Sequence, residues 1–226
     1  MDLEKHYNHL YTESIQKIES DSYSVDHLID EENDKRFGLT LILRPNKSVR
    51  LKIQQFLEEL NKIDAYQYIY KDAEMHVTVM AIISCQEGYT FHESSRKDYI
   101  EIIEQSLSNA SPFQINFQGL TASPSCILVQ GFPENHMLNQ IRENLRQNFK
   151  SSFIEQTIDK RYTIQTAHST ILRLRDKISN KQAFMSKIKE YRNINFGSSE
   201  ISTLELVYND WYHRTEKVKS IHTFTL

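Results

Sequence analysis

Two short motifs of the same form carry the residue types best suited to chemistry: HVTV at residues 76–79 and HSTI at residues 168–171. An imidazole can give or take a proton near neutral pH, and a Thr hydroxyl can donate a hydrogen bond to a phosphate oxygen. In a β-strand, residues two apart point to the same face, so each His is expected beside its Thr. Two such pairs facing each other across a cleft would supply a base, an acid and two anchors for a phosphate ester.

The loose pattern His-x-Ser/Thr is weak by itself, because it also occurs at His92 and His213. The stricter form, with an apolar residue after the Thr and a strand around it, leaves only His76 and His168. The alternative interpretation is a pair of core histidines whose ring nitrogens bond to neighbouring hydroxyls.

The elements that must position these motifs follow from the spacing of apolar residues. Helical spacing predicts helices over residues 1–20, 48–60, 93–107, 134–149 and 180–191. Short apolar or alternating stretches predict strands over residues 37–43, 75–83, 113–120, 126–130, 167–174, 201–208 and 218–224. The polar stretch at residues 21–35 is interpreted as a connector.

The order strand, helix, strand, helix, strand occurs twice at a nearly constant offset. The first strands of the two sets begin 89 residues apart, and the motif histidines lie 92 residues apart. We therefore predict an α+β fold of duplicated β-α-β-α-β units with bilobal pseudo-twofold symmetry, mainly antiparallel sheets lining a central cleft, and an extra N-terminal helix. Residues 1–35 form that helix and connector, and residues 36–226 form one bilobal domain with halves of about 36–122 and 123–226.

Composition and charge limit the class of ligand. The 226 residues are 39% hydrophobic and 25% charged, which is ordinary for a soluble globular chain, and the formal net charge is -3. Binding to long nucleic acid draws on a strongly basic surface, so a small nucleotide or short oligonucleotide is the expected substrate. No protein partner can be inferred.

Location and metal content are expected from what the sequence lacks. It has no apolar signal region and no run of 18 apolar residues, so we expect no membrane span and a cytoplasmic protein. Cys85 and Cys126 are expected to be buried free thiols, and the absence of a CxxC pair argues against a cysteine zinc site. No metal and no cofactor are expected.

On these motifs the chain resembles the two-histidine (2H) phosphoesterase superfamily, whose hallmark is a pair of His-x-Thr/Ser motifs each followed by an apolar residue. The resemblance runs from about Arg36 to the C-terminus and includes LILRP, HVTV, HSTI and LVYNDWYHR. Members include bacterial 2′,5′ RNA ligase-like and cyclic phosphodiesterase proteins.

The resemblance implies a bilobal fold and metal-independent opening or cleavage of ribose phosphodiesters. It assigns the acid and base roles to His76 and His168, and the phosphate-holding roles to Thr78 and Thr170. The chain departs from the family pattern in an N-terminal extension of about 35 residues and in the small polar Ser169 within the second motif.

Other residues have weaker claims to the site. Trp211 or Tyr212 could stack on a base, although an aromatic hairpin packed on the body is an equal alternative. Tyr162 shares the face of His168 if that strand extends back to it. Arg173 and Arg175 fall on the opposite parity and are expected at a solvated edge unless a bulge intervenes. The surface is the default for the remaining histidines: His6, His9, His27, His92, His136 and His222.

The resulting hypothesis is a metal-independent phosphodiesterase that acts on a 2′,3′-cyclic phosphate or on a 2′,5′-linked nucleotide or RNA end. The alternatives are a non-catalytic module that binds a nucleotide or RNA end, and a ligase that joins RNA ends through a 2′,5′ linkage. The sequence leaves open the substrate, the direction of reaction, the oligomeric state, the role of the N-terminal helix, and which His is the acid.

Overall fold

The computed structural model describes residues 2–226 and contains helices and strands in the predicted alternation. The helices are α1 (Leu3–Glu19), α2 (Lys47–Ile63), α3 (Arg96–Leu107), α4 (Met137–Ser151) and α5 (Lys181–Glu190). The strands are β1 (Arg36–Leu43), β2 (Tyr68–Ile69), β3 (Val77–Glu87), β4 (Phe113–Ser123), β5 (Cys126–Pro133), β6 (Ser169–Arg173), β7 (Asn195–Ile201), β8 (Thr203–Asp210) and β9 (Lys219–Thr225). Short 3-10 turns cover His27–Asp30, Asp72–Glu74 and Glu93–Ser95.

Several helices begin where a side chain satisfies a free backbone N–H group. Asp2 accepts from the N–H of Lys5 at the start of α1, and Asn46 accepts from Val49 at the start of α2. The predicted apolar stripe of α2 is buried, from Val49 to Leu60. None of the helices in residues 2–226 is long and apolar enough to cross a membrane.

Two antiparallel sheets form the body. The first sheet has the strand order β3-β1-β8-β9 and the second has the order β2-β6-β5-β4-β7. The first motif leads into β3, which pairs with β1, the first strand of its half. The second motif leads into β6, which pairs with β5, the first strand of the other half. The α+β class, the antiparallel sheets and the N-terminal helix agree with the sequence-based expectation.

The predicted halves, about 36–122 and 123–226, do not form separate sheets. The strand β4 belongs to the first half yet pairs with β5 in the second sheet, while β8 from the second half pairs with β1 in the first sheet. The reason is local: β4 and β5 are joined by a tight turn in which Ser123 pairs with Cys126, so they form one hairpin.

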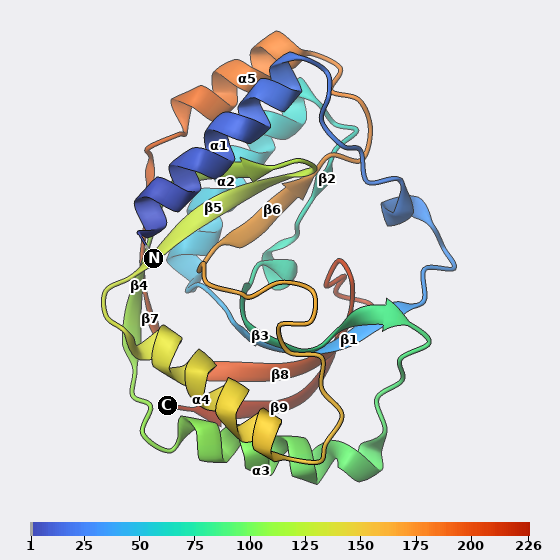
Figure 1. Ribbon diagram of the computed structural model, residues 1–226. Coiled ribbons are helices and arrows are strands. Elements are labelled where there is room, and N and C mark those ends of the chain that lie inside the picture. Colours follow the sequence, from blue (N-terminus) through green and yellow to red (C-terminus); the bar gives the residue numbers. More distant parts are fainter. Residues whose placement is uncertain (1) are drawn as a thin grey trace.

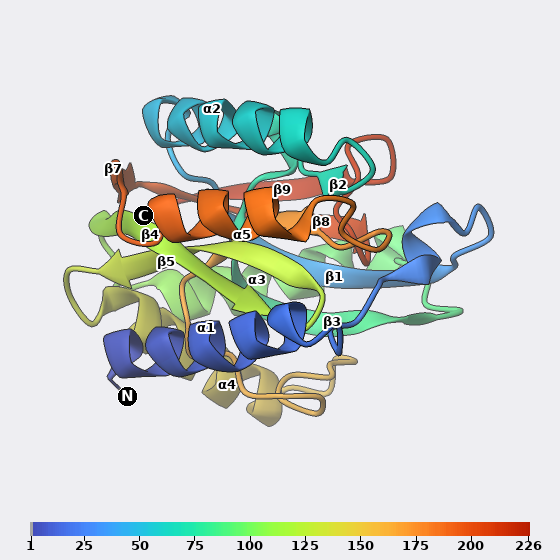
Figure 2. The ribbon, with the colours of Figure 1, turned by 90° about the horizontal axis from the view of Figure 1, so that it is seen from above.

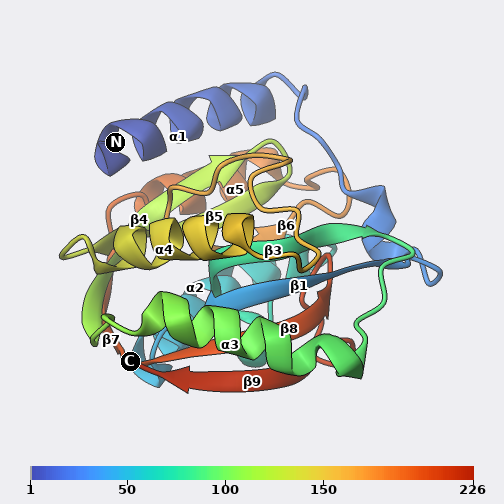
Figure 3. The same cartoon turned by 60° about the horizontal axis from the view of Figure 1, so that its bottom comes forward.

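Helices cover the sheets from outside (Figure 1). Helices α3 and α4 lie side by side and contact β9 and β3, the edges of the first sheet (Figure 3). Helix α2 contacts α5 and β7 at the second sheet. Helix α1 runs along the β4–β5 hairpin and contacts β4 (Figure 2).

The remaining differences from the predicted elements are at strand ends. The predicted strand over 201–208 corresponds to β8, which begins at Thr203, whereas β7 and the two-residue β2 were not predicted. The strands predicted over 75–83 and 167–174 begin later, at Val77 and Ser169, so both motif histidines lie just before their strands.

Candidate active site

A cavity of about 570 Å³ lies between the sheets and contains both motifs. This volume is within the range of about 300–1,000 Å³ typical of small-molecule sites. His76 and Thr78 line it from the first sheet, and His168 and Thr170 line it from the second. The structure thus brings together the four residues singled out by the sequence.

His76 is fixed through its Nδ1 atom, which lies 2.7 Å from the backbone carbonyl oxygen of Glu74. A carbonyl oxygen can only accept, so Nδ1 carries a hydrogen and the neutral ring keeps its lone pair on Nε2. The Glu74 side chain is itself buried, and its carboxylate accepts from the N–H of Lys71 and from both the N–H and the hydroxyl of Thr215. Glu74 therefore ties His76 to the loop that follows β8.

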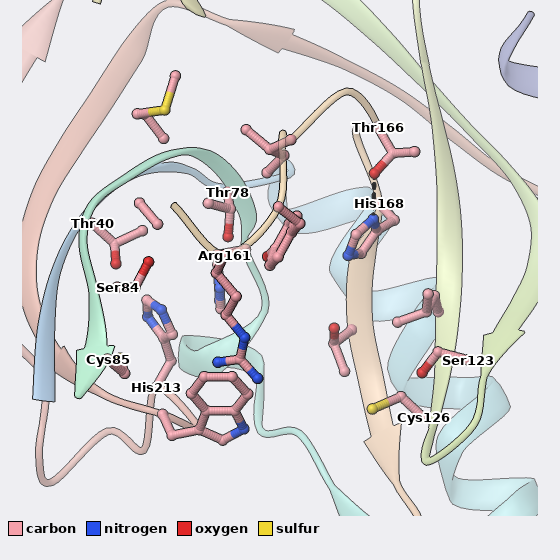
Figure 4. Close-up of a pocket in the computed structure, with 18 of the residues that line it drawn as sticks. Thr40, Thr78, Ser84, Cys85, Ser123, Cys126, Arg161, Thr166, His168 and His213 are labelled. Atoms are coloured by element: carbon pink, nitrogen blue, oxygen red, sulfur yellow. Dashed lines mark hydrogen bonds between the residues drawn. The ribbon is translucent and has the colours of Figure 1, made fainter. Parts of the chain in front are cut away.

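His168 has a different partner. Its Nδ1 atom lies 2.7 Å from the Thr166 hydroxyl oxygen (Figure 4). A hydroxyl can either donate or accept, so this contact allows His168 to present either a bare or a protonated Nε2 atom.

The backbone that leads to His168 is held against β5 and α1. A Cβ atom at Gly131 would collide with the carbonyl of Ala167, so only glycine permits this close approach. The buried Tyr7 hydroxyl of α1 donates to the carbonyl of Gly131 at 3.2 Å and accepts from the N–H of Ala167 at 3.1 Å. The N-terminal helix is thus bonded to the residue next to His168.

Both motif strands are irregular at the same place. In the pairing of β3 with β1, Val79 is skipped, and in the pairing of β6 with β5, Ile171 is skipped. Each is the apolar residue after the motif Thr, and each is fully buried. After a skipped residue, side chains that would have lain on one face of the strand lie on the other face.

The irregularity at Ile171 turns Arg173 into the cavity, which corrects its expected place at a solvated edge. Its guanidinium donates to the Tyr70 hydroxyl at 2.9 Å and pairs with Asp26 at 3.3 Å. Arg175, by contrast, is exposed and pairs with Asp30 at the surface, as expected. Arg173 adds a positive charge to the wall next to the two imidazoles.

A buried arginine of α4 forms hydrogen bonds to both motif segments. Arg142 donates to the carbonyls of Thr78 at 2.9 Å, Val79 at 3.0 Å and Thr166 at 2.8 Å. It is 1% exposed, and one of its nitrogens, Nη1, has no partner among the described residues. Burial lowers the pKa of Arg142 to about 10, which leaves it charged at neutral pH.

The surroundings keep both motif histidines neutral at pH 7. Burial, with smaller effects from Arg44, His168 and Arg173, lowers the pKa of His76 to about 4, although the bond to Glu74 opposes the change. Burial, with Arg142 and His6, lowers the pKa of His168 to about 4.

A third cavity histidine, His213, was not assigned a role from the sequence. It matches only the loose His-x-Thr pattern, and its loop has no regular periodicity that would reveal its direction. It is 8% exposed, and its ring centroid lies 3.8 Å from that of His76.

The two aromatic candidates, Trp211 and Tyr212, lie in different environments in the structure. Trp211 lines the cavity, with the Arg161 guanidinium 4.2 Å from its ring centroid. Tyr212 is fully buried, and its hydroxyl bonds to Asp26 and Arg36, so its predicted contact with substrate is wrong.

Tyr162 lines the cavity and is 63% exposed. The residues between Tyr162 and His168 are not in a strand, so the continuous strand assumed for Tyr162 is absent.

His6 also departs from expectation, since it is partly buried and lines the cavity rather than the surface. Cys85 and Cys126 are free thiols that line the same cavity. No cluster of three or more His, Cys, Asp or Glu able to hold a metal ion is found in residues 2–226.

Comparison with known protein families identifies the family of this chain. Residues 37–217 match the family described as AKAP7 2′5′ RNA ligase-like domain. The chain belongs to this family. Helix α1 and the connector precede the matched residues of this AKAP7 2′5′ RNA ligase-like domain. A search of curated proteins finds no significant match.

Solved structures of low sequence identity share the fold of this AKAP7 2′5′ RNA ligase-like domain. The protein TT0787 of Thermus thermophilus is 15% identical, with a TM-score of 0.60 over 84% of this chain and 97% of its own. E. coli LigT complexed with 3′-AMP is 10% identical, with a TM-score of 0.58 over 84% of this chain and 98% of its own. LigT complexed with ATP gives 10% and 0.53 over the same shares. The resemblance to the 2H phosphoesterase superfamily is thereby confirmed.

Proposed function

We propose that this protein is a metal-independent phosphodiesterase that opens a 2′,3′-cyclic phosphate or cleaves a 2′,5′-linked nucleotide or RNA end. One observation carries the proposal: two His-x-Thr pairs line a single cavity from opposite sheets, together with Arg173. The family match and the 3′-AMP complex of LigT support a nucleotide substrate.

The hydrogen-bond partners divide the acid and base roles. His76 is the base, because its Nδ1–H is held by a carbonyl and its bare Nε2 atom is free to accept a proton from water. His168 is the acid, because its partner Thr166 accommodates a protonated Nε2 atom.

The proposed reaction on a cyclic phosphate needs only these groups and water. The water oxygen bonds to phosphorus while His76 takes its proton. The bond from phosphorus to one ribose oxygen breaks, and His168 gives that oxygen a proton. Thr78, Thr170 and Arg173 hold the non-bridging oxygens, whose negative charge grows in the transition state. Trp211 and Tyr162, at the cavity wall, are proposed to contact the base.

The test is hydrolysis of a panel of nucleoside 2′,3′-cyclic phosphates and 2′,5′-linked dinucleotides in EDTA. His76→Ala and His168→Ala should each lower kcat by about 10²–10⁴-fold, the usual effect of one acid–base group. His92→Ala is the matched control, because His92 has the same loose motif but is exposed. Folded wild-type protein without turnover on any member would favour the binding module.

The ligase remains the second candidate, because the matched family is named for likeness to 2′5′ RNA ligases. The same groups would join two RNA ends if a ribose hydroxyl replaced water as the nucleophile. Product analysis with an RNA bearing a cyclic end and a second RNA distinguishes joining from hydrolysis. A steep fall of RNA affinity with salt would accompany a true RNA substrate.

A further inference from the structure

The loop after β8 places a third imidazole against the first motif. The rings of His213 and His76 have centroids 3.8 Å apart and an interplanar angle of 32°. This is closer than the roughly 4.5–7 Å usual for aromatic pairs. His213 is 8% exposed and lines the cavity on the side of Thr78 (Figure 4).

The loop is fixed so that the stack is held in place. His213 adopts the left-handed conformation with φ 57°, which is uncommon outside glycine. Its N–H donates to the carbonyl of Asp210 at 3.2 Å, and the Asp210 carboxylate accepts from the N–H and the Nε atom of Arg214. The next residue, Thr215, donates to the Glu74 carboxylate.

Glu74 therefore holds both members of the stack. Its carbonyl oxygen fixes Nδ1 of His76, and its carboxylate fixes the loop that carries His213. A chance contact between two side chains would not need a shared buried anchor.

The core alone gives no reason for a histidine at position 213. Its Nδ1 atom is buried and has no hydrogen-bond partner among the described residues. A buried polar atom without a partner destabilises the fold, so an apolar residue would suit this position better if packing were its only role.

We propose that His213 is a positioning residue for His76: its ring covers one face of the His76 imidazole, fixes the direction of Nε2 and excludes water from that face. The kinetic part of this inference rests on the proposed function, whereas the effect on His76 does not. The charged or titratable groups near His76 include Arg44, Arg173, His168 and His213 itself, together with Glu74, whose backbone carbonyl bonds to its ring.

The proton balance of the stack follows from these surroundings. Burial, then His76, Arg44 and Arg173, lower the pKa of His213 well below its usual range. The stack is therefore neutral at pH 7. Loss of the His213 ring would admit water to His76, which favours the charged form and raises the pKa of His76.

Two variants separate the ring from its nitrogens. His213→Asn removes the ring and tolerates the left-handed backbone, while His213→Phe keeps an aromatic face without titratable nitrogens. His92→Asn, at an exposed position, is the matched control. Thermal unfolding reports any loss of fold in each variant.

The first measurement is the titration of His76 by NMR of labelled histidine rings, with His76→Gln to assign its signals. The pKa of His76 should rise by about one unit or more in His213→Asn and stay near the wild-type value in His213→Phe. An unchanged pKa in His213→Asn, or an equal rise in both variants, overturns the inference. Neither result requires turnover, so a failure of the proposed phosphodiesterase activity is seen separately.

The second measurement is the pH profile of kcat and KM on a substrate that the wild type hydrolyses. His213→Asn should lower kcat on the order of tenfold with little change in KM, and its acidic limb should move to higher pH. His213→Phe should restore most of kcat. A loss confined to KM would instead mean that His213 contacts substrate, which contradicts a role through His76.

Discussion

The two motif imidazoles start the reaction in the same charge state although they must act in opposite senses. Burial lowers the pKa of both His76 and His168 to about 4, so both are neutral in the free protein at pH 7. A general acid must be protonated when the substrate reacts. The substrate's own phosphate, an anion between the two rings, is the group that can raise the pKa of His168 in the complex.

This coupling predicts a difference between two pH profiles. The profile of kcat/KM reports the free protein, and its falling limb should lie near the low pKa of His168. The profile of kcat reports the complex, where the phosphate charge favours imidazolium, so the falling limb should move to higher pH by about 1–3 units. Steady-state rates across pH on a cyclic nucleotide measure both, and coincident limbs would contradict the coupling.

At single residues, the sequence predicted the features that depend on residue type. It did not predict the direction of a side chain where that direction depends on an irregular backbone. The four motif side chains face the cavity because residues two apart share a face. Arg173 was expected to point away, since no sequence signal marks the skipped Ile171. Tyr212 and His213 are adjacent in a loop, where one is buried in the body and the other lines the cavity, and no periodicity distinguishes them.

Among the elements, α1 has a part in the site that its position before the matched residues conceals. Its Tyr7 hydroxyl is the shared partner of Gly131 and Ala167, so it fixes the backbone immediately before His168. His6, its neighbour on the helix, lines the cavity.

Tyr7→Phe should therefore weaken the fold and the reaction together. The Gly131 carbonyl and the Ala167 N–H would both lose a buried partner, at a cost of about 1–3 kcal/mol. A small displacement of His168 should lower kcat on the order of tenfold, since about 1 Å of misplacement can cost 10²-fold. Urea unfolding and initial rates measure the two effects.

Tyr11→Phe provides the control, because Tyr11 lies on the same helix and is only partly buried. Full activity in Tyr7→Phe, with stability reduced, would mean that α1 supports the fold without positioning His168.

Helices were predicted better than strands for a physical reason. An amphipathic stripe such as that of α2 runs for many residues, whereas β2 has only Tyr68 and Ile69. The strand β7 escaped prediction because its buried positions, Phe196, Ser199 and Ile201, do not alternate and include a polar serine, and because it contains Gly197, a poor strand former. The sequence pattern also did not predict the exchange of strands between the halves, because the order of strands along the chain does not determine which sheet each strand joins.

At the scale of the molecule, the cavity exists because two sheets with exchanged strands are held face to face. Arg142 bonds to β3 through Thr78 and Val79, and to the segment before β6 through Thr166. Burial is the main cause that lowers the pKa of both motif histidines; the charge of Arg142 lowers the pKa of His168 further, and His168 contributes to lowering that of His76. The site therefore has a concentration of groups that disfavour protonation of His76 and His168.

This concentration predicts that the fold loses stability in mild acid. In the unfolded chain these histidines bind a proton below the ordinary histidine pKa of 6.5, while the folded His76 and His168 resist it down to about 4. The unfolded chain thus holds more protons in that interval, so the free energy of unfolding falls as pH drops from 6.5 toward 4. Each histidine contributes at most about 3.5 kcal/mol, at about 1.4 kcal/mol per pKa unit.

Thermal unfolding across this pH range should show a decrease in Tm that is smaller in the double variant His76→Gln, His168→Gln. About 1 kcal/mol corresponds to roughly 2–4 °C for a chain of this size, so the difference is measurable. The double variant His92→Gln, His136→Gln changes the same number of histidines at exposed positions and should follow the wild type. If both double variants lose Tm as the wild type does, acid acts elsewhere in the fold, and the two motif histidines are not the groups that resist protonation.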